Sequence, residues 1–184
     1  MLTAYEICKA YDAPVLENFS YIFPEKGLVL IRGASGCGKT TLMRILAGLE
    51  QPDSGEIFSA QDLKISCVFQ EARLAPHLTA LDNLLLVSPK KDKQRAVEIL
   101  NQLGLEDAIH KYPGELSGGM RLRVSIARSL YYGGDLYLWD EPTKELDPEN
   151  RRTVKKIIDS LAKNACVIVV THDPELYSDT EIFL

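Results

Sequence analysis

Residues 33–40, with the sequence GASGCGKT, restrict the possible folds of this chain more than any other segment. They fit the pattern G-x-x-x-x-G-K-[ST], in which backbone N–H groups of the loop and of the following helix cradle phosphate groups. A compact apolar run at residues 28–31 precedes the loop, as expected for a strand buried on both faces. Apolar residues at positions 42, 45, 46 and 49 follow it with helical spacing. The order strand, loop and helix predicts a phosphate-binding loop on an α/β domain.

Lys39 and Thr40 carry the side-chain chemistry of this loop. In the loop pattern the lysine ammonium contacts the β- and γ-phosphates of a nucleotide, and the Thr hydroxyl is a ligand of Mg²⁺. The alternative is a glycine-rich turn that merely precedes a helix, but the apolar strand in front of it favours a nucleotide site. Kinases, GTPases, helicases and transport ATPases share this loop, so the loop alone does not identify the reaction.

Strands and helices alternate along the rest of the chain. Short strands are expected at residues 2–8 and 19–23, a turn at 51–55, further strands at 65–69, 136–139 and 166–170, and a helix beginning near Pro148. The stretch 71–112 is expected to be mostly helical, including residues 93–103. We therefore predict a single α/β domain, 1–184, with a mostly parallel sheet and an antiparallel β part at the N-terminal side. Its core is expected at about 1–70 and 131–184, with a helical insertion at about 71–130.

The apolar run at residues 136–139 ends in two adjacent acids, Asp140 and Glu141. Successive side chains of a strand point to opposite sides, so the two carboxylates can take different tasks. We expect Asp140 to be the metal-side group and Glu141 to orient or deprotonate the attacking water. Two acids that merely open a solvated loop before Pro142 are the alternative. The phosphate loop upstream favours the catalytic interpretation.

The charge pattern indicates which partners are expected. The net charge is −5 and the basic residues are spread along the sequence, which argues against a dedicated nucleic-acid-binding protein. The four cysteines form no C-x-x-C pair, and no leading segment resembles a signal peptide. The longest apolar runs fall far short of the ~20 residues that a membrane helix needs. The sequence predicts a cytoplasmic protein with no direct membrane span, which reaches a membrane through a partner.

Five further motifs accompany the loop and the acidic pair. They are the aromatic Tyr11, VFQ at residues 68–70, LSGGM at 116–120, ELD at 145–147 and THD at 171–173. In their joint order and rough spacing, these motifs resemble those of the ATP-binding subunit of an ABC transporter. The resemblance covers nearly the full length of the chain and implies the ABC ATPase fold, with a P-loop NTPase core.

The segment LSGGM separates this family from other P-loop proteins. Ser117 can cap a helix whose first turn holds Gly118 and Gly119, so that bare N–H groups and the helix dipole face an anion. The resemblance implies that two subunits pair head to tail, and that the signature of one closes over ATP held by the other. The expected partner is a second copy or a homologous ATP-binding subunit. The family usually has Gln at position 120, and Met120 lacks its polar contact, a loss of about 0.5–1.5 kcal/mol.

The resemblance also implies a role for each remaining motif residue. Catalytic roles fall to Glu141, His172, Gln70 and Lys39, and the expected Mg²⁺ ligands are Thr40, Gln70 and Asp140. Tyr11 is expected to stack on adenine. The other expected ATP-binding residues are Gly33, Ala34, Ser35, Gly36, Cys37, Gly38, Lys39, Thr40, Thr41, Ser117, Gly118, Gly119 and Asp147.

The predicted activity is ATP hydrolysis, with ATP and Mg²⁺ as cofactors, that powers transport of a solute these motifs do not identify. An integral membrane subunit is expected to contact the Gln70–Leu86 region, which places the chain on the cytoplasmic face of the membrane. A soluble ABC-type switch acting on ribosomes or nucleic acid is one alternative, disfavoured because long coiled-coil insertions and paired domains are absent from the sequence. A small-molecule P-loop kinase leaves the Ser-Gly-Gly signature and His172 unexplained. A binding module with little turnover disagrees with the intact Lys39, Asp140 and Glu141.

Overall fold

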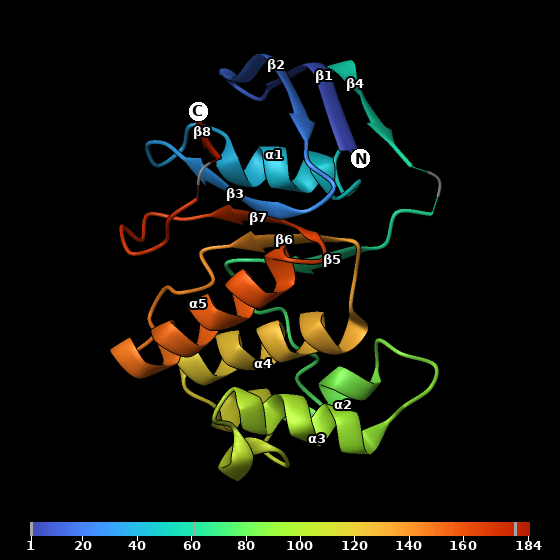
Figure 1. The fold of residues 1–184 in the computed structure, drawn as a ribbon, viewed down its shortest axis with the longest axis vertical. Helices are drawn as coiled ribbons and strands as arrows, with labels where there is room; N and C mark the ends of the chain where they lie inside the picture. The colour runs from blue at the N-terminus through green and yellow to red at the C-terminus, as the bar shows by residue number, and fades with distance from the viewer. Residues whose placement is uncertain (1, 61, 179) are drawn as a thin grey trace.

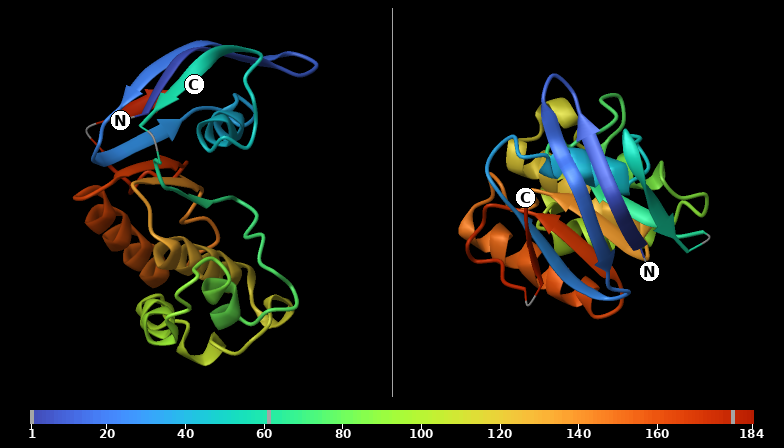
Figure 2. Two further views of the ribbon diagram at one scale, coloured as in Figure 1. Left: turned by 90° about the vertical axis from the view of Figure 1, so that its right-hand side faces the viewer. Right: turned by 90° about the horizontal axis from the view of Figure 1, so that it is seen from above.

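The chain forms stacked layers of sheet and helix (Figure 1). The computed structural model describes residues 2–60, 62–178 and 180–184. A five-stranded parallel sheet lies in the middle; helix α1 and a three-stranded antiparallel sheet cover one face, and the larger helices cover the other (Figures 1 and 2). This arrangement confirms the predicted α/β class with a parallel sheet and a separate antiparallel part.

The residues that follow the strands of the parallel sheet meet at one edge of the sheet. Its order is β5 (Ile65–Val68), β6 (Leu136–Asp140), β7 (Cys166–Val170), β3 (Gly27–Arg32) and β8 (Glu181–Phe183). Strands β6 and β7 are buried at every position, because both faces of the sheet are covered. Parallel strands end at the same edge, so the segments after β3, β5, β6 and β7 can form one site there.

Helix α1 (Lys39–Leu46) fixes the position of the phosphate loop. It lies between the parallel sheet and the antiparallel sheet formed by β2 (Pro14–Phe23), β1 (Leu2–Ala10) and β4 (Ser54–Ser59), as Figure 2 shows. Leu42 and Met43 of α1 are fully buried in a cluster with residues of both sheets. The helix is thereby held against the end of β3, and the loop between them is confined at both ends.

The other face of the parallel sheet packs against α4 (Gly118–Tyr132) and α5 (Pro148–Ala162). Helices α2 (Ala80–Leu85) and α3 (Lys93–Gln102) pack on α4, away from the sheet. Two 3-10 turns, η1 (Glu106–Ala108) and η2 (Pro113–Glu115), lead from α3 to α4. The second apolar cluster includes Trp139, whose indole N–H donates a 3.0 Å hydrogen bond to Ser129 Oγ.

Several predicted secondary-structure elements were wrong in extent. The N-terminal strands are longer than the predicted 2–8 and 19–23, because β1 and β2 pair along most of their length. Loops occupy the greater part of 71–112, which was expected to be mostly helical. The predicted turn at 51–55 runs into β4, which was not predicted, and β8 was also missed. Helix α1 ends at Leu46, before the predicted end at residue 49.

Within residues 2–60, 62–178 and 180–184, every helix is too short or too polar to cross a bilayer.

Candidate active site

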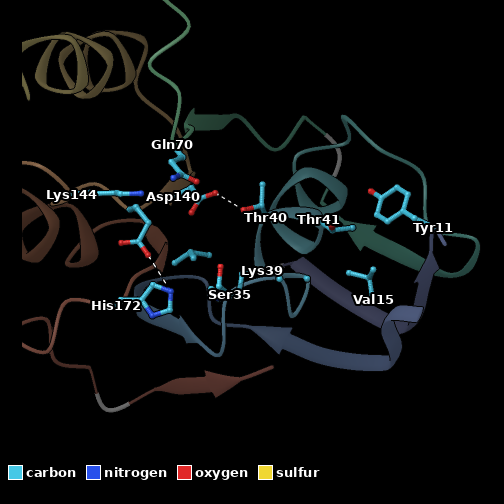
Figure 3. Close-up of a pocket in the computed structure, with 14 residues that line it drawn as sticks. Tyr11, Val15, Ser35, Lys39, Thr40, Thr41, Gln70, Asp140, Lys144 and His172 are labelled. Atoms are coloured by element: carbon cyan, nitrogen blue, oxygen red, sulfur yellow. Dashed lines mark hydrogen bonds and ion pairs between the residues drawn. The ribbon is translucent and has the colours of Figure 1, made fainter. Parts of the chain in front are cut away.

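A cavity of about 410 Å³ lies where the parallel strands end, and it gathers most of the predicted site residues (Figure 3). Segments that follow β3, β5, β6 and β7 contribute to it, together with the start of α1 and the β1–β2 hairpin. Its lining residues are Tyr11, Val15, Ser35, Gly36, Gly38, Lys39, Thr40, Thr41, Gln70, Asp140, Glu141, Lys144, Val170 and His172.

The phosphate loop is shaped by a glycine that no other residue could replace without strain. Gly38 has a φ of 100°, and a Cβ added there would lie 2.7 Å from the carbonyl oxygen of Val15. The loop can therefore approach β2 closely and turn directly into α1. The ammonium of Lys39, at the first turn of α1, donates to the carbonyl oxygens of Gly33 (2.9 Å) and Ala34 (2.7 Å). These bonds hold the lysine across the loop.

Thr40 and Asp140 place two side-chain oxygen atoms next to each other. The Thr40 hydroxyl donates a 2.9 Å hydrogen bond to Asp140 Oδ2, and Asp140 is only 2% exposed. Burial raises the pKa of Asp140, while the Thr40 hydrogen bond and the charges of Lys39 and Lys144 oppose the shift. A buried carboxylate beside a hydroxyl suits Mg²⁺, which prefers oxygen ligands and takes one or two from the protein. The residues present therefore fit the ion.

Glu141 adopts a backbone conformation that is uncommon for a residue with a side chain. Its φ is 53°, and its N–H donates a 2.9 Å hydrogen bond to the carbonyl oxygen of Val170 at the end of β7. Its Oε1 lies 3.7 Å from Nε2 of His172. Burial raises the pKa of Glu141, and contacts with His172 oppose the shift. Such outliers concentrate at functional sites, where the surrounding structure holds them.

Gln70 and Tyr11 lie at different parts of the cavity. Gln70 follows β5 and lies close to Asp140 in Figure 3. Tyr11 lies on the β1–β2 hairpin at the other end, near Thr41 and Val15. The tyrosine hydroxyl donates a hydrogen bond to Glu50 Oε1, and the Lys9 ammonium lies 5.7 Å from the centre of the ring. The cavity is thus long enough to have an aromatic end and a carboxylate end.

The signature residues do not line this cavity. The structure confirms that Ser117 caps α4, because its hydroxyl accepts a 3.2 Å hydrogen bond from the Met120 N–H. Gly118 lines a neighbouring cavity together with Gln70, Glu141 and Glu145. Outside the first cavity lie Gly33, Ala34, Cys37, Ser117, Gly118, Gly119 and Asp147. Asp147 caps α5 by accepting from the N–H groups of Glu149 and Asn150.

Val15, Lys144 and Val170 line the cavity but were not predicted as site residues; Val170 is the last residue of the predicted strand at 166–170. Val15 belongs to β2, which no site motif includes, so only the packing of β2 against the loop places it there. Lys144 stands between the acidic pair and the ELD motif, where its position in the sequence offered a signal. An ionisable residue three positions after a candidate catalytic acid can return to the same site when the chain turns.

Comparisons with known proteins identify the family of this chain. The sequence profile of the family described as ABC transporter matches residues 16–144. The chain is 38% identical over 161 residues to the aliphatic sulfonates import ATP-binding protein SsuB 1 of Shouchella clausii, a match covering 86% of this chain and 65% of the relative. It is 39% identical over 189 residues to the macrolide export ATP-binding/permease protein MacB of Photorhabdus laumondii, covering 91% and 29% respectively. The chain therefore spans less than two thirds of the length of either relative.

A solved structure is also similar over the whole chain. It is the dimeric, post-hydrolysis state of the ATP-binding cassette MJ0796 bound to ADP and Pi. Its TM-score is 0.92 at 30% sequence identity, and the match covers 100% of this chain and 94% of that one. The profile match and the shared architecture, together with the arrangement of the phosphate loop, acidic pair and histidine, show that this chain belongs to the ABC transporter family as an ATP-binding cassette.

Proposed function

We propose that the chain is the ATP-hydrolysing subunit of an ABC transporter. The observation that carries this proposal is the meeting of Lys39, the acidic pair Asp140 and Glu141, and His172 in one cavity of about 410 Å³. A phosphate loop supplies binding, but a carboxylate paired with a histidine beside it supplies the means to activate water.

In this proposal the residues of the cavity have separate tasks. Lys39 and the loop N–H groups bind the β- and γ-phosphates, and Tyr11 lies at the end suited to the base. Glu141 holds the attacking water and accepts its proton, while His172, 3.7 Å away, keeps the carboxylate in place. Thr40, Asp140 and Gln70 are the proposed ligands of Mg²⁺. The ion, when bound, neutralises charge on the phosphate oxygens.

A second copy or a homologous subunit completes the site in this proposal. The first turn of α4 carries Ser117, Gly118 and Gly119 but lies outside the nucleotide cavity. Its free N–H groups form an anion-binding end that can serve a partner's phosphate. The similar cassette MJ0796 is described as dimeric. We infer a head-to-tail dimer in which ATP binding favours closure because the closed state binds ATP more tightly.

An integral membrane subunit is the second proposed partner. An apolar cavity of about 500 Å³ adjoins the Gln70–Leu86 region, and Leu49, Phe69, Val87 and Tyr132 help to line it. Leu49 is 62% exposed and Tyr132 is 38% exposed, so apolar side chains gather at the surface of this groove, as they do at protein interaction sites. The name of the relative MacB includes a permease. We propose that a permease segment binds this groove and that the chain lies on the cytoplasmic face of the membrane.

The proposed domain division keeps a core of about 1–70 and 131–184 and an insertion of about 71–130. Helix α4 connects the two parts, because it packs on β5 as well as on α2 and α3. A movement of the insertion would therefore be transmitted to the segment after β5, which contains Gln70. This is a route by which nucleotide binding and the permease can affect each other. In this proposal the permease, and not this chain, selects the transported solute.

The variant Glu141→Gln tests the function. We expect it to lose ATP turnover by a factor of about 100 or more while still forming dimers in the presence of ATP and Mg²⁺. Glu149→Gln, a change of an exposed acid on α5 outside the cavity, is the matched control and should turn over ATP like the wild type. Wild-type turnover in Glu141→Gln would contradict the proposed role of this carboxylate. Failure of the wild type to hydrolyse ATP, alone and with its co-purified permease, would contradict the proposed function.

A further inference from the structure

Lys144 lies in the site, and none of the roles described above involves it. It follows Glu141 in the loop after β6, and its N–H donates a 3.1 Å hydrogen bond to the carbonyl oxygen of Glu141. Pro142 and Thr143 between them are buried, so the loop is anchored. Positive φ angles at Glu141 (53°) and Glu145 (61°) turn the chain back on itself on both sides of Lys144. The turn returns this side chain to the cavity.

The side chain of Lys144 points into the nucleotide cavity. It lines the cavity with Lys39, Asp140 and Glu141, and Figure 3 shows it extending toward Asp140 and Gln70. It also lines the neighbouring cavity that contains Gly118. Lys144 therefore stands where the carboxylate end of the nucleotide cavity opens toward the signature segment. This end is opposite the aromatic end occupied by Tyr11.

The charge of Lys144 is close enough to affect both acids but pairs with neither. Burial raises the pKa of Asp140 and of Glu141, and the charge of Lys144 opposes both shifts. Yet no carboxylate oxygen of the described residues lies within 4.0 Å of its ammonium. Lys39, in contrast, is held by two carbonyl oxygens of the loop. An ammonium in a cavity with a free donor capacity suits an anionic group of a ligand.

We propose that Lys144 is a second phosphate-binding cation, which contacts the terminal phosphate of ATP from the β6 side of the cavity while Lys39 contacts it from the loop side. The proposal rests on the proposed nucleotide site and adds to it a preference for ATP over ADP. Because Lys144 lies at the carboxylate end, it contacts the γ-phosphate and has no partner on ADP. Lys144 thus increases the affinity for ATP relative to ADP.

Nucleotide affinities of Lys144→Met and Lys144→Arg test this role. The probes are ADP and the non-hydrolysable ATP analogue with an imido group between the β- and γ-phosphates, each with Mg²⁺, titrated into dilute protein shown to be monomeric by sedimentation. Lys144→Met should bind the analogue about tenfold more weakly, the loss of one charge-assisted hydrogen bond, and ADP within about twofold of the wild type. Lys144→Arg should restore most of the analogue affinity. Lys93→Met, which changes an exposed lysine at the start of α3, is the matched control.

Salt supplies a readout that a purely structural role of Lys144 would not change. The wild-type preference for the analogue over ADP should decrease as salt rises, and Lys144→Met should lose most of this dependence. Equal analogue affinities of the wild type and Lys144→Met would overturn the proposal. So would equal losses for the analogue and ADP, or a loss seen only in the dimer. Failure of the wild type to bind either nucleotide would instead contradict the proposed function.

Discussion

The hydroxyl of Thr40 donates a 2.9 Å hydrogen bond to Asp140 Oδ2 and joins the first turn of α1 to the end of β6. The two residues are 100 positions apart in the sequence. The bond connects the phosphate loop with the carboxylate pair and places both oxygen atoms at one point of the cavity. The carboxylate of Asp140 is only 2% exposed, and this burial makes its ionised form unfavourable for folding.

Replacing Asp140 by Asn should stabilise the protein at neutral pH. Burial raises the pKa of Asp140, so the folded protein binds more protons than the unfolded chain as the pH rises from the ordinary value of 3.8 through the folded value. Stability falls through this window and stays lower above it. Asn keeps an acceptor for Thr40 without the charge. Denaturant titrations at pH 7 should give a gain on the order of 1 kcal/mol, which disappears below the ordinary pKa.

Asp53→Asn is the control, for which we expect the opposite change in stability at neutral pH. The hydrogen bond from Lys9 and that from the Ala10 N–H lower the pKa of Asp53. Its contribution to stability is therefore present at neutral pH and lost as the pH falls through the lowered value. The variant should be less stable than the wild type at pH 7, and the difference should fade in acid. A loss of stability at pH 7 in both variants would show that the charge of Asp140 is not unfavourable.

The sequence predicted four of the five strands of the parallel sheet, because β3, β5, β6 and β7 are recognisable without their neighbours, whereas the three-residue β8 was missed. The run at residues 166–170 is apolar throughout, and β7 has these bounds. In contrast, β4 has mostly exposed positions and begins inside a predicted turn. Its Gly55 has a φ of 85°, and an added Cβ would lie 2.3 Å from the carbonyl oxygen of Glu6. Only pairing with β1 makes this segment a strand, and a local pattern does not contain that information.

The candidate site also contains some residues that the sequence predicted and others that it did not. Lys39, Thr40, Asp140 and Glu141 belong to short motifs next to recognisable strands, so their meeting followed from the rule that parallel strands end at one edge. The contribution of Val15 depends on how β2 packs against Gly38. Glu50 directly precedes the predicted turn at residues 51–55 and gave no signal of its contact with Tyr11, because that contact depends on where α1 ends against the hairpin.

Glu50 should determine how well Tyr11 receives the base. Its carboxylate accepts from the tyrosine hydroxyl and lies 3.8 Å from the Lys9 ammonium, and α1 fixes its distance from the phosphate loop. Glu50→Ala should weaken ATP binding by about three- to tenfold, because the ring loses a defined orientation. Turnover at saturating ATP should stay within about twofold, since the base end lies far from the carboxylate end. Steady-state kinetics separate KM from kcat.

Two further variants make the Glu50 result decisive. Tyr11→Phe removes the same hydrogen bond but keeps the ring, so it should match Glu50→Ala. Tyr11→Ala should weaken ATP binding at least as much and leave no further effect when combined with Glu50→Ala. Additive losses in the double variant would contradict an effect of Glu50 through the tyrosine. Unchanged affinity in Tyr11→Ala would remove the tyrosine from the base site.

His172 should shift the acid limb of the pH–rate profile to lower pH through its effect on the pKa of Glu141. Burial raises the pKa of Glu141, and contacts with His172, including its charge, oppose the shift. Turnover requires the carboxylate form, so it should fall as the pH decreases through this raised pKa. In His172→Gln the opposing contribution is lost and the residual activity should begin to fall at a higher pH. The measurement is kcat against pH for both proteins, and an acid limb at unchanged pH would contradict the coupling.

Met120→Gln should strengthen the ATP-bound dimer. The backbone N–H of Met120 is already used by the Ser117 hydroxyl, and its thioether is at best a weak acceptor, so the residue offers a partner little polar contact. A Gln amide at this position adds a donor at the start of α4. One new hydrogen bond of about 0.5–1.5 kcal/mol at each of the two sites of a homodimer corresponds to a roughly 5- to 150-fold tighter dimer. Sedimentation of Glu141→Gln with and without Met120→Gln, in ATP and Mg²⁺, measures this difference, and ATP affinity of the dilute monomer should be the same in both. A weaker dimer, or a change confined to the monomer, would show that position 120 does not face the partner's nucleotide.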